Sequence, residues 1–171
     1  MKKLFSLCAL SLILGFSGLA KADFPWGLNQ ADVTKKHPGG KTKCKDEDCD
    51  YTSFQKNKDL KEGVYVTYLF KNDSLQSVMF IFTTPEDKGN GFEDLKFLSK
   101  QQTTEVLVYL TKTLTKSFGE PKMGKRKDDL MLYWENDASL ILILEVCDKV
   151  GQTVLPNCQP LAIFKSKLNP I

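Results

Sequence analysis

The chain has 171 residues, of which 42% are hydrophobic and 26% are charged, and its formal net charge is +3. This length fits one domain that buries a core of its own, so the fold does not depend on cross-links as a miniprotein would. Residues 1–22 contain three lysines and no acidic residue, which leaves 21 basic and 21 acidic residues in the rest of the chain. That balance gives no warrant for nucleic-acid binding, which draws most of its affinity from a net basic stripe, so we expect no nucleic-acid partner.

Residues 1–22 have the pattern of a secretory signal peptide. Lys2 and Lys3 precede an apolar run over residues 4–20, and Ala20 and Ala22 are the small residues that such a cleavage site needs. The run is interrupted by glycine and serine and falls short of the roughly 20 strongly apolar residues of a membrane-spanning helix. We therefore expect cleavage before Asp23, no stable membrane anchor, and a single domain over residues 23–171 that is periplasmic or secreted.

The four cysteines that remain after this cleavage predict two disulfides. An exported protein meets an oxidising environment, where an even number of cysteines favours pairing, and four cysteines allow three connectivities. Proximity along the chain favours the two local pairs, and neither spacing is the Cys-x-x-Cys of a redox site. We expect structural disulfides that join Cys44 to Cys49 and Cys147 to Cys158.

The first half of the exported chain predicts a short helix followed by strands. Asn29 is a helix-capping residue type, and Pro38-Gly39-Gly40 ends the helix after about Lys36. The polar residues 41–50 predict a cross-linked loop, and residues 51–54 predict a short strand. Two β-rich runs, 64–70 and 75–82, flank Asn72-Asp73, which is typical of a hairpin turn.

The second half predicts a longer helix, a second hairpin and a last strand. Ser99 and Gln102 have the spacing of a capping box, apolar residues follow a helical period to Phe118, and Gly119 ends the helix. The hairpin covers 130–134 and 139–146, and the last strand covers 161–164. This order predicts an α+β fold with two layers, helices on an antiparallel sheet, built from two α-β-β-β pseudo-repeats.

This succession of a helix and then a sheet resembles the BamE and β-lactamase-inhibitor-protein superfamily. The residues that carry the resemblance are Trp26-Gly27 before the first helix, Pro38-Gly39-Gly40 at its end, and Phe118-Gly119-Glu120-Pro121 ahead of the later strands. Members of that superfamily bind other proteins of the bacterial envelope as assembly factors or inhibitors, so the resemblance implies a protein-binding role. The chain lacks the lipid-attachment cysteine of the assembly factor, and no site residue is carried over.

The residue types that common catalytic and metal sites need are scarce. His37 is the only histidine, and its place at a helix end predicts a cation that interacts favourably with the helix dipole. Asp46, Asp48 and Asp50 alternate as at the start of an EF-hand loop, but the glycine and the bidentate glutamate of that loop are missing. We therefore predict a solvated acidic loop, no catalytic residue, no metal and no cofactor.

The two hairpins predict which residues share a face of the sheet. A three-residue loop over 72–74 pairs Val66 with Phe80, and the same loop length over 136–138 places Trp134 on one side with Leu142. Both faces of the hairpins are then apolar. The second face is predicted to carry a strip made of Tyr65, Met79, Ile81, Met131, Tyr133, Ile141 and Ile143.

Two interpretations of this strip follow. Either it is covered, by the termini, by residues 84–98 or by a second copy in a homodimer, or it is an exposed binding surface. Tyrosine and methionine suit protein recognition, so the sequence predicts a module that binds another envelope or extracellular protein, as an inhibitor or assembly accessory, through the strip or adjoining loops. The alternatives are a carrier of a small apolar ligand or lipid and, third, a carboxylate-dependent hydrolase.

Overall fold

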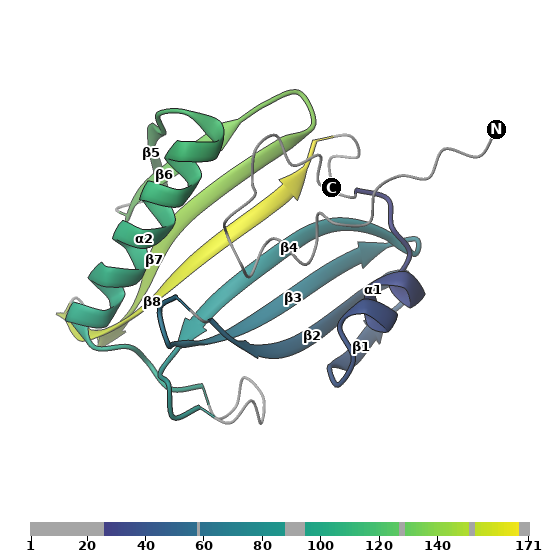
Figure 1. The fold of residues 1–171 in the computed structure, drawn as a ribbon, viewed down its shortest axis with the longest axis horizontal. Coiled ribbons are helices and arrows are strands. Elements are labelled where there is room, and N and C mark those ends of the chain that lie inside the picture. The colour runs from purple at the N-terminus through teal and green to yellow at the C-terminus, as the bar shows by residue number, and fades with distance from the viewer. Residues whose placement is uncertain (1–25, 58, 88–94, 127–128, 151–152, 168–171) are drawn as a thin grey trace.

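A computed structural model describes residues 26–57, 59–87, 95–126, 129–150 and 153–167 (Figure 1). The predicted signal peptide lies outside these residues. The described helices are α1 (Gln30–Lys36) and α2 (Lys100–Phe118). The strands are β1 (Lys41–Lys45), β2 (Asp48–Lys56), β3 (Gly63–Lys71), β4 (Ser74–Thr83), β5 (Lys122–Arg126), β6 (Asp129–Glu135), β7 (Ser139–Val150) and β8 (Thr153–Ser166).

The strands form one eight-stranded antiparallel sheet with the order β1-β2-β3-β4-β8-β7-β6-β5. α1 with β1 to β4 and α2 with β5 to β8 therefore make two units of like order, which meet where β4 pairs with β8. Figure 1 shows the two helices on the same side of the sheet, over its opposite ends. The predicted α+β fold, with helices on an antiparallel sheet, is confirmed, and each unit has four strands rather than three.

The additional strand of each unit is the outermost one, β1 or β5. All five residues of β1 are exposed, so its sequence lacks the alternation of apolar and polar residues that indicates a half-buried strand. Lysine-rich edge strands of this kind resist pairing with other chains. Strand prediction from sequence relies on that alternation, which reflects burial of one face. It therefore assigns residues 41–45 to a loop.

Local capping explains where the helices begin and end. The Asn29 side chain accepts a hydrogen bond of 2.8 Å from the backbone N–H of Asp32 at the start of α1. The predicted capping box of α2 is present, with Ser99 and Gln102 exchanging side-chain and backbone bonds. Gly119 ends α2 with a φ of 82°, a left-handed conformation that favours glycine.

The face of the sheet that both helices cover is called the inner face. Strand pairing aligns Val66, Phe80, Ala162 and Ile143 in one row across it, and Tyr68, Val78, Phe164, Ile141 and Trp134 in the next. These side chains form one core with Val33 of α1 and with Val106, Leu110 and Leu114 of α2. The indole N–H of Trp134 also donates to the carbonyl oxygen of Gly119 at 2.7 Å, which fixes the end of α2 over the sheet.

The first hairpin has the predicted pairs but reaches them by another route. Its turn contains two residues, Asn72 and Asp73, with φ of 50° and 55°, and it pairs Lys71 with Ser74. A bulge at Gln76 of β4, opposite Leu69 and Phe70, then shifts the register by one residue. Beyond the bulge Val66 lies opposite Phe80, as predicted from a three-residue loop.

The second hairpin also turns through two residues, Asp137 and Ala138, because the Asn136 backbone N–H donates to the carbonyl oxygen of Ser139 at 3.0 Å. Its described pairs keep one register. Asn136 closes the turn, because its side chain accepts from the backbone N–H groups of Ala138 and Ser139 at 3.0 and 2.7 Å. Trp134 therefore lies opposite Ile141, and the predicted register of this hairpin is wrong by one residue. Ile141 and Ile143 belong to the inner core, 1% and 3% exposed, and Leu142 occupies the face that was assigned to them.

Candidate binding surface on the outer sheet face

The face opposite the helices, called the outer face, carries two apolar rows that cross the sheet. One row contains Thr67, Met79, Ile163, Leu142 and Tyr133 in successive strands. The other contains Phe54, Tyr65, Ile81, Leu161, Leu144 and Met131. We name these two rows the outer strip, which includes five of the seven residues predicted for the strip and excludes Ile141 and Ile143.

Most of the outer strip is half-buried. Met79, Ile81, Met131 and Tyr133 all have intermediate exposure, and so do Leu142, Leu161 and Ile163, which sequence reasoning did not place there. In the described part of the chain both helices pack on the inner face. The outer strip is thus an apolar surface that the helical layer does not cover.

One end of the outer strip is closed by the chain that follows β4. Tyr65 is only 1% exposed, and its hydroxyl donates to Asp87 at 2.9 Å. The Thr83 hydroxyl donates to the other oxygen of the same carboxylate at 2.9 Å. The ring of Phe54 packs against the ring of Tyr65, with ring centres 5.1 Å apart. Residues 84–98 were expected to cover this face, and Asp87 does so at the Tyr65 end. Tyr65 therefore has a structural role. Leu98 instead joins the inner core, and residues 88–94 are outside the described part.

The opposite end of the outer strip has a charged rim. The Lys122 ammonium lies 5.9 Å from the centre of the Tyr133 ring and 3.9 Å from Glu135. Lys167 donates to Glu135 at 2.9 Å, and this hydrogen bond and its charge hold the pKa of Glu135 below its ordinary value. Such a polar border around an apolar centre is the usual anatomy of a protein interface.

A cavity of about 420 Å³ adjoins the β1–β2 hairpin. Lys43, Lys45, Asp48, Asp50 and Lys71 supply charged side chains, and its remaining walls are Cys44, Cys49, Leu69, Phe70 and Gln76. Sequence reasoning missed this cavity because it treated residues 41–50 as a solvated loop. The acidic residues 48 and 50 lie in a strand instead, where they face lysines across the ladder.

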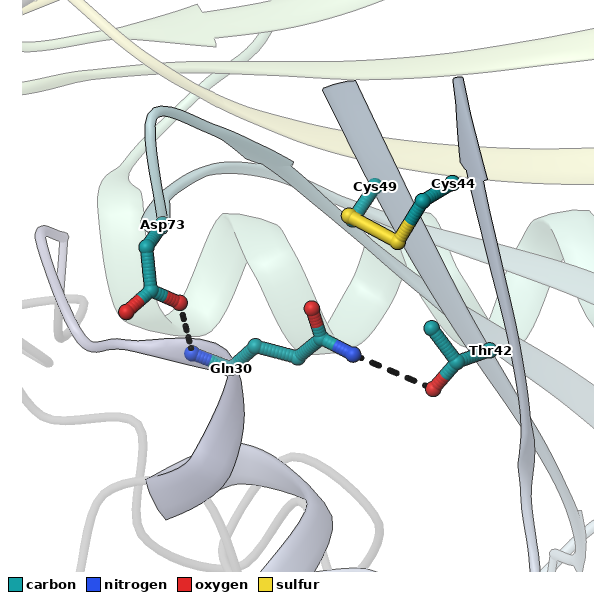
Figure 2. The surroundings of a disulfide bond; sticks show 5 residues. All are labelled: Gln30, Thr42, Cys44, Cys49 and Asp73. Carbon is teal, nitrogen blue, oxygen red and sulfur yellow. Dashed lines mark hydrogen bonds between the residues drawn. A yellow bond between two sulfur atoms is a disulfide. The ribbon is translucent and has the colours of Figure 1, made fainter. Parts of the chain in front are cut away.

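The disulfide beside the cavity joins Cys44 to Cys49 and confirms the first predicted pair. The two cysteines are direct register partners, with Cα atoms 4.1 Å apart. Figure 2 shows how α1 secures the same corner: the Gln30 backbone N–H donates to Asp73 at 2.9 Å, and its side-chain amide donates to Thr42 at 3.1 Å. Backbone pairing places Cys147 opposite Cys158, but their side chains lie outside the described part, so the second disulfide stays a prediction.

His37 does not supply the cation that was expected at the end of α1. Its ring stacks on Tyr68 with centres 5.3 Å apart, and burial, assisted by the charge of Lys36, lowers its pKa. Its backbone N–H makes the capping bond to Val33 at 3.0 Å, and its carbonyl oxygen accepts from the Tyr51 hydroxyl. The neutral ring is a packing element.

A group of carboxylates where the β2–β3 loop meets α2 bears on the hydrolase alternative. Glu62 is buried, and burial, reinforced by the charge of Glu105, raises its pKa while its own backbone opposes the shift. Tyr109 of α2 donates to Asp59 at 2.7 Å. Neither the nearby charge of Glu105 nor the hydrogen bond between Tyr109 and Asp59 places a nucleophile or a second buried acid beside Glu62. Within the described ranges, three or more histidine, cysteine, aspartate or glutamate side chains never gather as a metal site would require.

Two further findings bear on the function. A helix of the length and apolarity that would cross a bilayer does not occur among the residues described. Comparison with protein-family models, with curated proteins and with solved structures finds no match for this chain.

Proposed function

We propose that the protein is an exported module that binds another envelope or extracellular protein through the outer strip. The observation that carries the proposal is that the apolar rows containing Met79, Leu142 and Tyr133 cross the sheet on the face that α1 and α2 leave uncovered. An antiparallel sheet with helices on one side commonly presents polar residues on the other. Large apolar surfaces that depart from this rule mark interaction sites.

The chemistry of the outer strip supports a protein rather than a small ligand. Methionine and tyrosine are enriched in protein interfaces, and the two rows cross successive strands as a surface. A carrier would instead enclose an apolar cavity between helix and sheet, whereas the cavity beside the disulfide is open and has five charged residues among its lining residues. An inhibitor or an assembly accessory is the kind of protein that such a surface fits.

The experiment compares substitutions on the two faces of the exported protein. Met79→Asp and Tyr133→Asp introduce a charge at half-exposed positions, so we expect melting temperatures close to wild type. We also expect loss of partner capture from the native envelope, because the charge would be desolvated in the complex. Lys112→Asp on the exposed side of α2 is the control and should retain capture. Unchanged capture by both strip variants would overturn the proposal, and severe destabilisation by both would show that the outer strip is core.

The homodimer alternative uses the same surface and is separated by a second measurement. Sedimentation of the purified exported protein reports whether copies associate through the outer strip. A dimer that dissociates in Met79→Asp, together with no captured envelope protein, would replace the proposed function with self-association.

A further inference from the structure

Lysines are concentrated on the outer face of the sheet. Side-chain direction follows from register, because residues that pair across strands share a face. Both edge strands contribute, and so do two strands from inside the sheet. The lysines at outer-face positions include Lys41, Lys43, Lys45, Lys71, Lys122 and Lys165.

Carboxylates on the same face are fewer among the described side chains. Asp48 and Asp50 lie at outer positions of β2, and Asp87 lies at the Tyr65 end of the outer strip, where it accepts from Tyr65 and Thr83. Glu135 lies at the end of β6, where Lys167 pairs with it at 2.9 Å. The chain after residue 22 carries equal numbers of acidic and basic residues. The outer face is therefore positive within a molecule whose exported part is neutral.

The lysines near the disulfide converge on a hollow. Lys43, Lys45 and Lys71 all line the cavity of about 420 Å³, together with Asp48 and Asp50, which offset part of their charge. In the described part of the chain no ion pair joins these three lysines to either aspartate. Their ammonium groups are available to an incoming carboxylate.

Edge protection alone does not explain this arrangement. Lysines on β1 and β5 would discourage pairing with other chains, but Lys71 belongs to β3 and Lys165 to β8, which both have strand neighbours on each side. Lys165 is only half-exposed and sits beside the apolar rows, opposite Ser77 and Leu140. A positive charge at that place has no role in protecting an edge.

We propose that the partner of the outer strip is an acidic protein, and that an acidic segment of this partner enters the cavity beside the Cys44–Cys49 disulfide. This inference rests on the proposed function and names the chemistry of its partner. Apolar side chains of the partner cover the rows that contain Met79 and Leu142, and its carboxylates meet Lys43, Lys45 and Lys71. Complementary charge of this kind sets the association rate and the choice of partner more than the final affinity.

A protein fits this surface better than an anionic bilayer does. Antiparallel sheets twist, so the two rows, which cross five and six strands, do not lie in the plane of a membrane. The cavity also admits a protruding segment, which a lipid surface does not offer. Binding to lipid vesicles is therefore an outcome that separates the two.

The test uses the purified exported protein and a fluorescent octapeptide of alternating glutamate and leucine. We expect saturable binding that weakens as salt is raised, and no binding of the matched peptide in which glutamine replaces glutamate. Reversal of the three cavity lysines, Lys43→Glu, Lys45→Glu and Lys71→Glu together, should weaken binding at least about tenfold. The matched control reverses three exposed lysines of the helices, Lys35, Lys100 and Lys112, which lie on the inner side of the sheet, and should change binding less than about twofold.

The remaining outcomes overturn the inference. Equal weakening by the two triple variants would mean that net charge, rather than the cavity, binds the peptide. Absence of peptide binding, or stronger binding to vesicles of phosphatidylglycerol than to the peptide, would remove the acidic protein as the partner. If envelope capture is still lost in Met79→Asp while the acidic peptide fails to bind, the proposed function stands and only this inference is wrong.

Discussion

The β3–β4 and β6–β7 hairpins both turn through two residues, but the first shifts its register by one residue beyond the turn and the second does not. In β3–β4 the turn at Asn72 and Asp73 is followed by a bulge at Gln76, whereas β6–β7 keeps its register from Glu135 to Met131. An extra residue in one strand exchanges the faces of everything beyond it. The bulge therefore decides which residues of the first hairpin reach the core. The described β6–β7 pairs contain no bulge, so the other alternate residues reach the core in the second hairpin.

Both faces of both hairpins are apolar, so burial alone does not choose between the two registers. Where one face is polar, the hydrophobic pattern alone specifies register. Here Ile141 and Leu142 are similar side chains on successive residues, yet one is 1% exposed in the core and the other lies half-exposed in the outer strip. The backbone geometry of the turn therefore decides which of these two residues lies in the core and which lies in the outer strip.

The largest expected effect comes from placing the same charge on each face of β7. Ile141→Asp buries an unpaired carboxylate among Trp134 and Phe164, and we expect a loss of about 4 kcal/mol or more in unfolding free energy. Leu142→Asp keeps its carboxylate near solvent and should cost far less. Urea unfolding of the two variants measures the difference, and equal destabilisation would show that the register at this hairpin is misassigned.

A smaller effect is expected at the turn that sets the second register. Asn136→Ala removes the side-chain oxygen that accepts from Ala138 and Ser139, and should cost about 1–2 kcal/mol through two lost hydrogen bonds. Asn136→Asp retains an acceptor there and serves as the matched control. If the alanine variant unfolds at the same urea concentration as wild type, the side chain of Asn136 does not fix this turn.

The smallest effect contrasts the ends of the two helices. α1 ends at His37, while α2 ends at Gly119. Burial and the charge of Lys36 hold the pKa of His37 below 6.5. Because the unfolded chain binds the proton more tightly, stability should fall as pH drops below about 6.5 and stop falling below the folded pKa. His37→Phe keeps an aromatic ring on Tyr68 and should flatten this part of the melting profile between pH 7.5 and 5. An identical pH dependence in both proteins would mean that His37 is not responsible.

The parts that sequence predicted well depend on local chemistry. Asn29, the Ser99–Gln102 box and Gly119 bound the helices through contacts within a few residues, and the turn residues located both hairpins. β8 proved much longer than residues 161–164, because β7 and β8 stay paired to Val150 and Thr153 across the stretch that was treated as a disulfide loop. That extension depends on the partner strand and leaves no local pattern.

The candidate surface was predicted less completely, for reasons that also lie beyond local sequence. The bulge at Gln76 has no signature in the residues around it, so the loop length predicted the register of the first hairpin correctly and that of the second wrong by one residue. The burial of Tyr65 depends on Asp87, 22 residues away. The lysine cavity depends on Lys71, which reaches β1 only through the pairing of β2 with β3.

Thiol labelling within the native envelope tests the docking role of the outer strip most directly. Met79→Cys and Ile141→Cys are each exported and exposed to a maleimide, first as purified protein and then in intact envelopes. We predict that Met79→Cys reacts in the purified protein and is protected in the envelope, because a partner covers it there, while Ile141→Cys is protected in both. Equal labelling of Met79→Cys in the two settings would contradict the account, since the outer strip would then be uncovered where the protein works.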